Sequence, residues 1–436
     1  IGAAVGLGNI WQFPANLGAS GGSAFFLIYF ASILLVATPI MLAEMIIGRN
    51  TGLSAPSAMK KLAVEIGASP NWALVGYMGL FALFLVLGFY SVIAGWCIAY
   101  FFKASSGSIA GLSPAEVGRE FNALISNPSK MFIWHAVFSS VTIFVVSKGI
   151  KTGLERVIKI AMPALLITLI GLVIYAGITG DTYTAYKFLF APDFSKLTPP
   201  IILAAVGQAF FSVNVGAGAV ITYSAYLPKD VHLFKSAITI AGGDTLVAVL
   251  AGLAIFPIVF AYGLDPSEGA GLLFVTLSTA FAKMPGGSIV ASAFFLMLMC
   301  AALTSLINML ESITSRAVEI KGVTRQKAAI LIGSAACISG FITIMSFAEW
   351  GNFYPLARFE IFAKSNPFDL IIFLVQRLIM PIGGVLFAIF VGWKLSKKLV
   401  LEEIGLEDNM LFKLWMFLLR IVAPIAISIV FITSFS

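Results

Sequence analysis

The sequence predicts an all-α integral membrane protein with eleven membrane-spanning helices. Hydrophobic residues make up 60 % of the 436 residues and charged residues only 11 %, whereas a soluble domain needs far more charge to cover its surface. A spanning helix needs about 20 mostly apolar residues. Eleven stretches qualify as candidates: 1–18, 23–48, 73–105, 131–148, 154–179, 197–226, 234–262, 287–320, 325–347, 368–394 and 409–434.

The segments between these stretches are too short to form a second domain. The larger loops include 106–130, 180–196, 263–286 and 348–367. The first stretch is short, and we expect the sequence to begin inside helix 1, without its cytoplasmic start. It lacks the basic region and small-residue cleavage site of a signal peptide.

Lysine and arginine predict the orientation. With the N-terminus in the cytoplasm, the cytoplasmic loops hold a clear excess of these residues over the outer loops, as the positive-inside rule requires. We therefore expect a multi-pass protein of the plasma membrane, embedded in the lipid bilayer. The net charge of +7 then reflects this bias, and no nucleic-acid partner is expected. The cysteines Cys97, Cys300 and Cys337 lie within spans, so no disulfide framework is indicated.

Two of the stretches contain the same interruption. Val5-Gly6-Leu7-Gly8 lies in the first, and Val215-Gly216-Ala217-Gly218 lies in the sixth. Two glycines raise the cost of a continuous helix by about 1 kcal/mol each. Close packing against a neighbouring helix is one explanation of such glycines. Their recurrence in corresponding helices favours a second explanation. In this explanation the glycines break both helices and form the binding site of a secondary transporter.

This recurrence also predicts an internal repeat of five helices. Because five is odd, the second copy has the opposite orientation in the membrane. We expect a first inverted repeat at 1–179, a second at 197–394, and an additional helix at 409–434. Helices 1 and 6, the first of each repeat, are broken at the midplane.

Glu44 and Asp244 are carboxylates inside predicted spans, where a charge costs several kcal/mol unless it is compensated. Glu44 could accept hydrogen bonds from backbone N–H groups freed at a break, or it could be an interfacial residue near Arg49. Asp244 lies near the midplane of its span. This position favours a functional role, and a structural carboxylic acid that pairs with a proton is the alternative.

The chain resembles the neurotransmitter:sodium symporter family over essentially its whole length, and in particular its prokaryotic amino-acid transporters. The residues that carry the resemblance are Gly2-Ala3-Ala4-Val5-Gly6-Leu7-Gly8-Asn9-Ile10-Trp11, Phe13-Pro14, Gly21-Gly22, Glu44 to Arg49, Tyr90 to Trp96, Gln208-Ala209-Phe210-Phe211-Ser212, Gly216 to Gly218, Thr222-Tyr223, Gly243-Asp244-Thr245 and Leu303-Thr304-Ser305. The phrase in helix 1 is highly specific to the family, and the phrase in helix 6 is nearly so.

The resemblance implies two sodium ions, each held by oxygen atoms as a hard cation prefers. The first site would comprise Ala4, Asn9, Ser212 and Asp244, and the second Gly2, Val5, Ala301, Thr304 and Ser305. Read from the residues alone, the hydroxyls of Thr304 and Ser305 would be expected to bond back to their own helix. Animal members usually carry Asn at the position of Asp244 and bind chloride nearby. With Asp244 supplying the negative charge and Ala248 replacing a hydroxyl, we expect chloride-independent transport.

The resemblance also implies a substrate pocket suited to a zwitterionic amino acid. Its members are Ala4, Leu7, Gly8, Val86, Tyr90, Phe211, Ser212, Asn214, Ala217, Ser305 and Met309. Freed amides at Leu7 and Gly8, with the hydroxyl of Tyr90, suit a carboxylate. The apolar members favour a large aliphatic or aromatic side chain. Taken singly, any of these apolar residues could equally serve ordinary helix packing.

The outer gate departs from the family pattern. Family members usually carry an arginine at the position of Gln12 and an aspartate near that of Ile372. The absence of both charges is coherent, because either one alone would be an unpaired, partly buried charge. We expect an outer gate formed by Tyr90 and Phe211, with Gln12 and Gln208 as neutral hydrogen-bonding groups.

Three further charged residues are candidates for gating. Glu319 resembles the acidic partner of the inner gate. Glu311 could line the inward pathway or pair with a basic residue near the inner surface. Arg377 lies inside helix 10, where an arginine indicates a functional role. It could pair with Asp369, contact a substrate group, or bridge helices.

Together these features predict a sodium-coupled amino-acid symporter that works by alternating access. One alternative is a proton- or other-cation-coupled transporter of another small solute on the same fold, with Asp244, Glu44 or Glu311 as proton carriers. An amino-acid receptor without transport is a second alternative. A membrane enzyme is disfavoured because the two histidines, His135 and His232, accompany no catalytic or metal-binding pattern. The sequence gives no indication of oligomeric state.

Overall fold

The computed structural model describes residues 5–267, 271–320 and 322–433. Within this part of the chain every regular element is helical, and nine helices are long and apolar enough to cross a membrane. They are α2 (Ser23–Ser32) continuing as α3 (Thr38–Thr51), α5 (Ala73–Ser105), α7 (Pro128–Ser147), α8 (Glu155–Thr179), α12 (Leu233–Ala261), α14 (Gly287–Val318), α15 (Arg325–Phe347), α16 (Pro367–Ile372) continuing as α17 (Met380–Ile389), and α19 (Met410–Phe417) continuing as α20 (Ala423–Thr433).

The other two expected spans are not continuous helices. Val5 and Gly6 are not helical, and a wide helical turn at Gly8–Gln12 leads into α1 (Phe13–Ala19). The sixth span consists of α10 (Pro199–Ser212) and α11 (Ala219–Ser224), separated by an unwound segment. The structure therefore shows both interruptions, while the count of eleven spans and the inverted repeat stay predictions.

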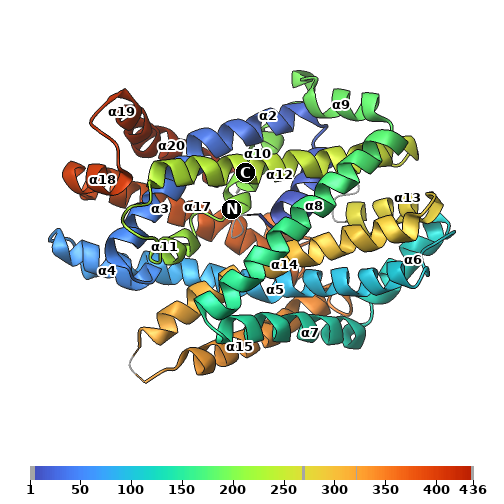
Figure 1. Cartoon of the computed structure of the whole chain (residues 1–436), viewed down its shortest axis with the longest axis horizontal. Helices are drawn as coiled ribbons and strands as arrows, with labels where there is room; N and C mark the ends of the chain where they lie inside the picture. Colours follow the sequence, from blue (N-terminus) through green and yellow to red (C-terminus); the bar gives the residue numbers. More distant parts are fainter. Residues whose placement is uncertain (1–4, 268–270, 321, 434–436) are drawn as a thin grey trace.

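The connections between the spans contain further short helices. They contain α4 (Ala55–Glu65), α6 (Pro114–Ile125), α9 (Thr182–Phe190), α13 (Leu277–Lys283) and α18 (Lys397–Ile404). In Figure 1, α4 and α18 lie at one end of the molecule, and α6, α9 and α13 lie at the other. We refer to these as the α4/α18 end and the α6/α9 end.

The buried apolar side chains form two clusters. One joins α5, α7, α8, α14 and α15, and the other joins α2, α3, α4, α10 and the C-terminal helices. Different faces of α12 contribute to the two clusters: Ile255 belongs to the first and Phe256 to the second. Within the second group, α10 packs on α2 and α11 packs on α3. The two interrupted segments therefore lie where the two packed groups of helices meet.

Candidate functional site

The interruption of helix 1 brings its backbone against α5 and α14. The Leu7 N–H donates to the hydroxyl oxygen of Tyr90 at 2.7 Å, and the Gly6 N–H donates to Oδ1 of Asn9 at 3.0 Å. A Cβ atom at Gly6 would lie 2.2 Å from Oγ of Ser305. Glycine is therefore needed here because the backbone approaches the side chains of α14 directly.

The interruption of helix 6 is held by a buried carboxylate. Residues Asn214, Gly216 and Gly218 adopt left-handed conformations, with φ of 58°, 85° and 71°. The Gly216 N–H donates to Oε1 of Glu44 at 2.6 Å. Glu44 thus lies at the break and satisfies an amide that has lost its helical partner. Arg49 pairs instead with Glu403 at 2.8 Å, so the interfacial interpretation of Glu44 is wrong.

Asp244 is the centre of a buried polar cluster between α12, helix 1 and α10. Its carboxylate accepts from Nδ2 of Asn9 at 2.7 Å and from the hydroxyl of Ser212 at 2.7 Å. The Tyr29 hydroxyl lies 3.1 Å from Oγ of Ser212 and 3.3 Å from the Asp244 carboxylate. Three of the four residues expected at the first sodium site, Asn9, Ser212 and Asp244, are therefore in contact, while Ala4 lies outside the described residues.

A second set of oxygens surrounds the hydroxyl of Thr304 on α14. It lies 3.0 Å from the carbonyl oxygen of Ala301 and 3.5 Å from that of Val5. Oxygens that share one cation at about 2.4 Å are separated by about 3–3.5 Å. Thr304 bonds back to its own helix, as one interpretation proposed, and also faces the broken helix 1. Gly2, the remaining backbone ligand expected here, lies outside the described residues.

A small central cavity lies between the two breaks. It is lined by Gly6, Gly8, Tyr90, Phe211, Ser212, Asn214, Ser305 and Met309 and has a volume of about 20 Å³. All of these except Gly6 were expected in the substrate pocket. This volume suits a single water molecule. The side chains must therefore move apart to admit an amino acid.

Three expected pocket residues lie elsewhere. Leu7 lines the larger outer cavity rather than the central one. Val86 is buried in the cluster around α5. The carbonyl of Ala217 packs against Gly79 so closely that a Cβ atom there would lie 2.3 Å from its oxygen. Val86 and Ala217 thus form part of the packing around the described cavities.

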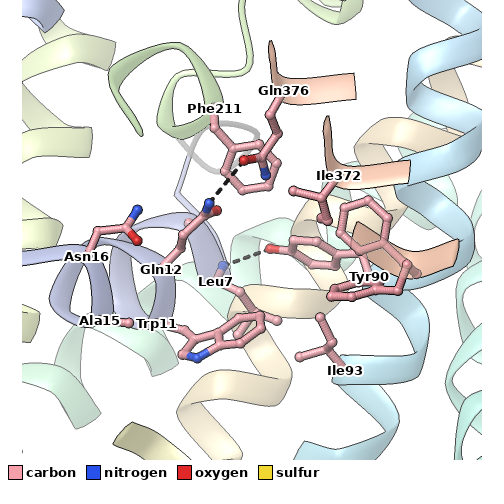
Figure 2. A pocket seen from close by; sticks show the side chains of 13 residues that line it. Leu7, Trp11, Gln12, Ala15, Asn16, Tyr90, Ile93, Phe211, Ile372 and Gln376 are labelled. Atoms are coloured by element: carbon pink, nitrogen blue, oxygen red, sulfur yellow. Dashed lines mark hydrogen bonds between the residues drawn. The ribbon is translucent and has the colours of Figure 1, made fainter. Parts of the chain in front are cut away.

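Tyr90 and Phe211 separate the central cavity from an outer cavity of about 200 Å³. Figure 2 shows the outer cavity, with Gln12 and Gln376 facing each other across it. Nε2 of Gln12 donates to Oε1 of Gln376 at 3.3 Å. Nε2 of Gln208 donates to the carbonyl oxygen of Gly8 at 2.9 Å. A neutral glutamine pair thus occupies the position where the resemblance implied a salt bridge.

Arg377 does not join this pair. Its side chain is exposed and lies over the ring of Phe373, with 5.9 Å between the guanidinium carbon and the ring centroid. Asp369 instead caps its own helix, accepting from the Asn366 N–H at 3.0 Å. Arg377 and its neighbour Gln376 point in different directions from the same helix, and Gln376 is the one that lines the outer cavity.

Both acidic gate candidates at the α4/α18 end have partners. Glu319 accepts from the hydroxyls of Ser54 and Ser57 at 2.6 and 2.5 Å, and lies 3.4 Å from Arg316. Glu311 is buried, 2.6 Å from Arg325. The pairing interpretation of Glu311 is therefore realised. A cavity of about 190 Å³ lies on this side of the central cavity, and Asn214 lines both.

Two site residues were not identified from the sequence. Tyr29 is an aromatic residue within an apolar span, and nothing in its neighbourhood distinguishes its hydroxyl from that of a packing tyrosine. Gln376 adjoins Arg377, whose charge gave the stronger signal. Both residues can be identified as site residues only from the three-dimensional arrangement of helices 2 and 10.

Two interrupted helices that place backbone groups, buried carboxylates and hydroxyls around one closed cavity define a secondary transporter. The chain matches the model of the sodium:neurotransmitter symporter family over residues 1–123 and 115–436 and belongs to that family. It is accordingly a sodium-dependent, multi-pass membrane transporter and not an enzyme.

Similar proteins agree with this assignment. An uncharacterized sodium-dependent transporter, YhdH of Bacillus subtilis (strain 168), is 38 % identical over 99 % of this chain and 94 % of its own length. One from Haemophilus influenzae is 33 % identical over 99 % of this chain and 95 % of its own. The crystal structure of MhsT in complex with L-phenylalanine superimposes with a TM-score of 0.92 at 42 % identity, covering 100 % of this chain and 96 % of the other.

Proposed function

We propose that this protein is a sodium-coupled symporter that imports a neutral amino acid with a hydrophobic or aromatic side chain by alternating access. The observation that carries the proposal is the central cavity, which has two chemically different ends. The Tyr90 hydroxyl, which accepts from the Leu7 amide, offers a hydrogen-bonding group at one end, and Phe211 and Met309 give the other end apolar surface. The binding of L-phenylalanine by MhsT supports the same substrate class.

Two sodium ions are co-transported in this proposal. The first is held by Asn9, Ser212 and Asp244 with Ala4, and the second by Val5, Ala301, Thr304 and Ser305 with Gly2. The contacts among Asp244, Ser212 and Asn9 support the first site, and the oxygens facing Thr304 support the second. Because the Asp244 carboxylate supplies a negative charge beside the first ion, transport is independent of chloride.

Alternating access follows from movement of helices 1, 2, 6 and 7 against the remaining helices. The interruptions of helices 1 and 6, together with the packing of α10 on α2 and of α11 on α3, support this. In this proposal the helices are arranged as two inverted repeats, at 1–179 and 197–394, with a further helix at 409–434. Tyr90, Phe211, Gln12 and Gln376 close the outer side, and Glu319 with Ser54 closes the side that faces the cytoplasm, toward which the N-terminal side of helix 1 is directed.

The test is uptake of labelled amino acids into proteoliposomes at fixed pH, with an inward gradient of sodium or of potassium. Uptake of phenylalanine, tryptophan or leucine only under the sodium gradient is the expected result. Equal uptake under both gradients, with stimulation by an inward proton gradient, would replace sodium by proton coupling. Uptake confined to charged or small polar amino acids would overturn the substrate class.

A further inference from the structure

A groove with basic and aromatic walls lies where helices 10 and 11 meet at the α4/α18 end. We call it the basic groove. It has a volume of about 450 Å³ and is lined by Trp393, Lys397, Phe412, Lys413, Phe417 and Arg420, with Met416 and Ile421. In Figure 1, α18 and α19 lie at the same end of the molecule, joined by a loop. The groove is remote from the central cavity and shares no lining residue with it.

Arg420 is the deepest cation of the groove. It lies inside the apolar span Met410–Thr433, yet its side chain is exposed. Its Nε donates to the carbonyl oxygen of Gly392, and its guanidinium carbon lies 5.5 Å from the ring centroid of Trp393. No carboxylate of the described residues forms an ion pair with it. An arginine at a lipid-facing position is costly unless an anion accompanies it.

The other cations give the groove a positive excess. Lys413 precedes Arg420 by two helical turns and lies on the same face of its helix. Lys397 pairs with Asp408 at 2.5 Å, and this hydrogen bond lowers the pKa of the Asp408 carboxyl. Asp408 therefore stays ionised but neutralises only one of the three cations. The groove therefore keeps a net positive charge, which a phosphate group can neutralise.

Its apolar walls face away from the protein. Trp393 is 59 % exposed and Phe417 is 54 % exposed, although both belong to apolar membrane-spanning segments. Aromatic side chains at such positions lie at the level between the acyl chains and the head groups. A ligand that satisfies the whole groove therefore combines an anionic group with an acyl chain.

We propose that the basic groove binds one anionic phospholipid, with the phosphate between Arg420 and Lys413 and an acyl chain against Trp393 and Phe417. Clusters of basic residues beside membrane helices recognise anionic lipids by this chemistry. The bound lipid would neutralise Arg420 and join the ends of helices 10 and 11.

Lipid retention by the full chain, measured by native mass spectrometry, tests the proposal. The purified protein is offered equimolar phosphatidylglycerol and phosphatidylcholine. We expect one phosphatidylglycerol to be retained in preference to phosphatidylcholine, and the preference to fall at least tenfold, as loss of two charges predicts, in the double variant Lys413→Gln/Arg420→Gln. The matched control Arg156→Gln/Lys159→Gln removes the same charges from exposed positions of α8 and should keep the preference.

Arg420 also bonds to Gly392, so the double variant could fail to fold. The single variant Lys413→Gln then serves as the test. Its preference for phosphatidylglycerol should fall about threefold to fivefold. Equal retention of both lipids by the unaltered protein would overturn the proposal. The proposal would also be overturned if the folded Lys413→Gln/Arg420→Gln or Lys413→Gln variant kept the full preference for phosphatidylglycerol. Displacement of the lipid by millimolar inorganic phosphate would assign the groove to free phosphate instead.

Discussion

Asp244 is a carboxylate in the membrane interior whose cost is offset by directed donors. Asn9 and Ser212 each donate to it at 2.7 Å, and Tyr29 lies at 3.3 Å. These contacts come from three different helices, so the carboxylate also connects helix 1 and helix 2 to α12. A negative charge fixed here suits a cation, and in the proposed mechanism it takes the place of an external anion.

Replacing Asp244 with Asn should make transport depend on chloride. Asparagine removes the charge and keeps the side-chain shape, so an anion from solution must balance the sodium ion. We expect uptake by Asp244→Asn to fall at least tenfold in gluconate buffer, as loss of a buried charge–charge contact implies, and to recover partly in chloride. The unaltered protein should transport equally in both buffers. Chloride-dependent uptake by the unaltered protein would contradict the proposal.

Tyr90 should contribute to substrate affinity through its hydroxyl. Tyr90→Phe leaves the Leu7 amide without its 2.7 Å partner and removes a donor for the substrate carboxylate. A lost hydrogen bond of this kind costs about 1–2 kcal/mol, so amino-acid binding should weaken about fivefold to thirtyfold. Isothermal titration in saturating sodium measures this.

Tyr100→Phe is the matched control on the same helix. The Tyr100 hydroxyl is buried without a hydrogen-bond partner among the described residues and lies outside the central cavity, so its removal should leave affinity unchanged. Equal affinities of Tyr90→Phe and Tyr100→Phe would remove Tyr90 from the substrate site.

Individual site residues could be predicted where a rare residue type marks them. Asp244 and Glu44 are carboxylates in apolar spans, and both lie in buried polar contacts. Tyr29 and Gln376 carry no such mark because tyrosine and glutamine occur in many packing roles. Arg377 shows the converse: a charge in a span drew attention, yet its exposed side chain lies over Phe373.

At the scale of elements, the breaks are stabilised by neighbouring side chains rather than by their own sequence. Glu44 on α3 accepts from the Gly216 amide at 2.6 Å. Glu44→Ala should therefore lower the free energy of unfolding by about 1–3 kcal/mol, the cost of an unsatisfied buried group. Glu44→Gln keeps an acceptor oxygen and should cost less.

Thermal melts in detergent, with and without sodium, measure this difference. Glu65→Ala on α4 is the control, because Glu65 is exposed and should change stability little. Equal melting temperatures for Glu44→Ala and the unaltered protein would show that the break does not depend on this carboxylate.

Helix 2 is tied to α18 by an ion-pair network at Glu403. Burial opposes ionisation of Glu403, but hydrogen bonds from Lys229, Arg49 and Asn50 outweigh it, and the pKa is lowered. A lowered folded-state pKa contributes stability that is fully present above the unfolded value of about 4.3 and is lost as pH falls through the folded value.

Glu403→Gln should therefore destabilise the protein equally at pH 7 and pH 5. The gap to the unaltered protein should shrink only below about pH 4. Melting temperatures across this range measure it, with Glu402→Gln at an exposed neighbouring position as the control. A gap that closes between pH 7 and pH 5 would contradict the assigned direction.

The spans were predictable at this scale because hydropathy and length are local properties. Nine of the expected stretches correspond to continuous apolar helices of the described chain, and both glycine phrases mark real interruptions. The loop helices were not predicted. For α6 a signal was present, since Ser113 and Glu116 form a capping box. The partners of each break could not be read from the sequence because they lie on helices far along the chain.

For the whole molecule, the decisive feature is the boundary between two packed groups of helices. Each group has its own apolar cluster, and the polar contacts of Asp244, Glu44 and Tyr90 lie where the breaks meet this boundary. Ions that bind at the breaks would stabilise the same arrangement that closes around the substrate. Sodium and substrate binding should therefore be coupled, and such coupling is reciprocal.

The most direct measurement is the affinity of the purified protein for L-phenylalanine across a range of sodium concentrations at fixed pH, together with its sodium affinity across a range of L-phenylalanine concentrations. We predict that each ligand tightens the binding of the other by the same factor, at least tenfold, as typical coupling energies allow. Potassium should not substitute for sodium. L-phenylalanine affinity that does not change with sodium would contradict the claim that the two sites share the broken helices.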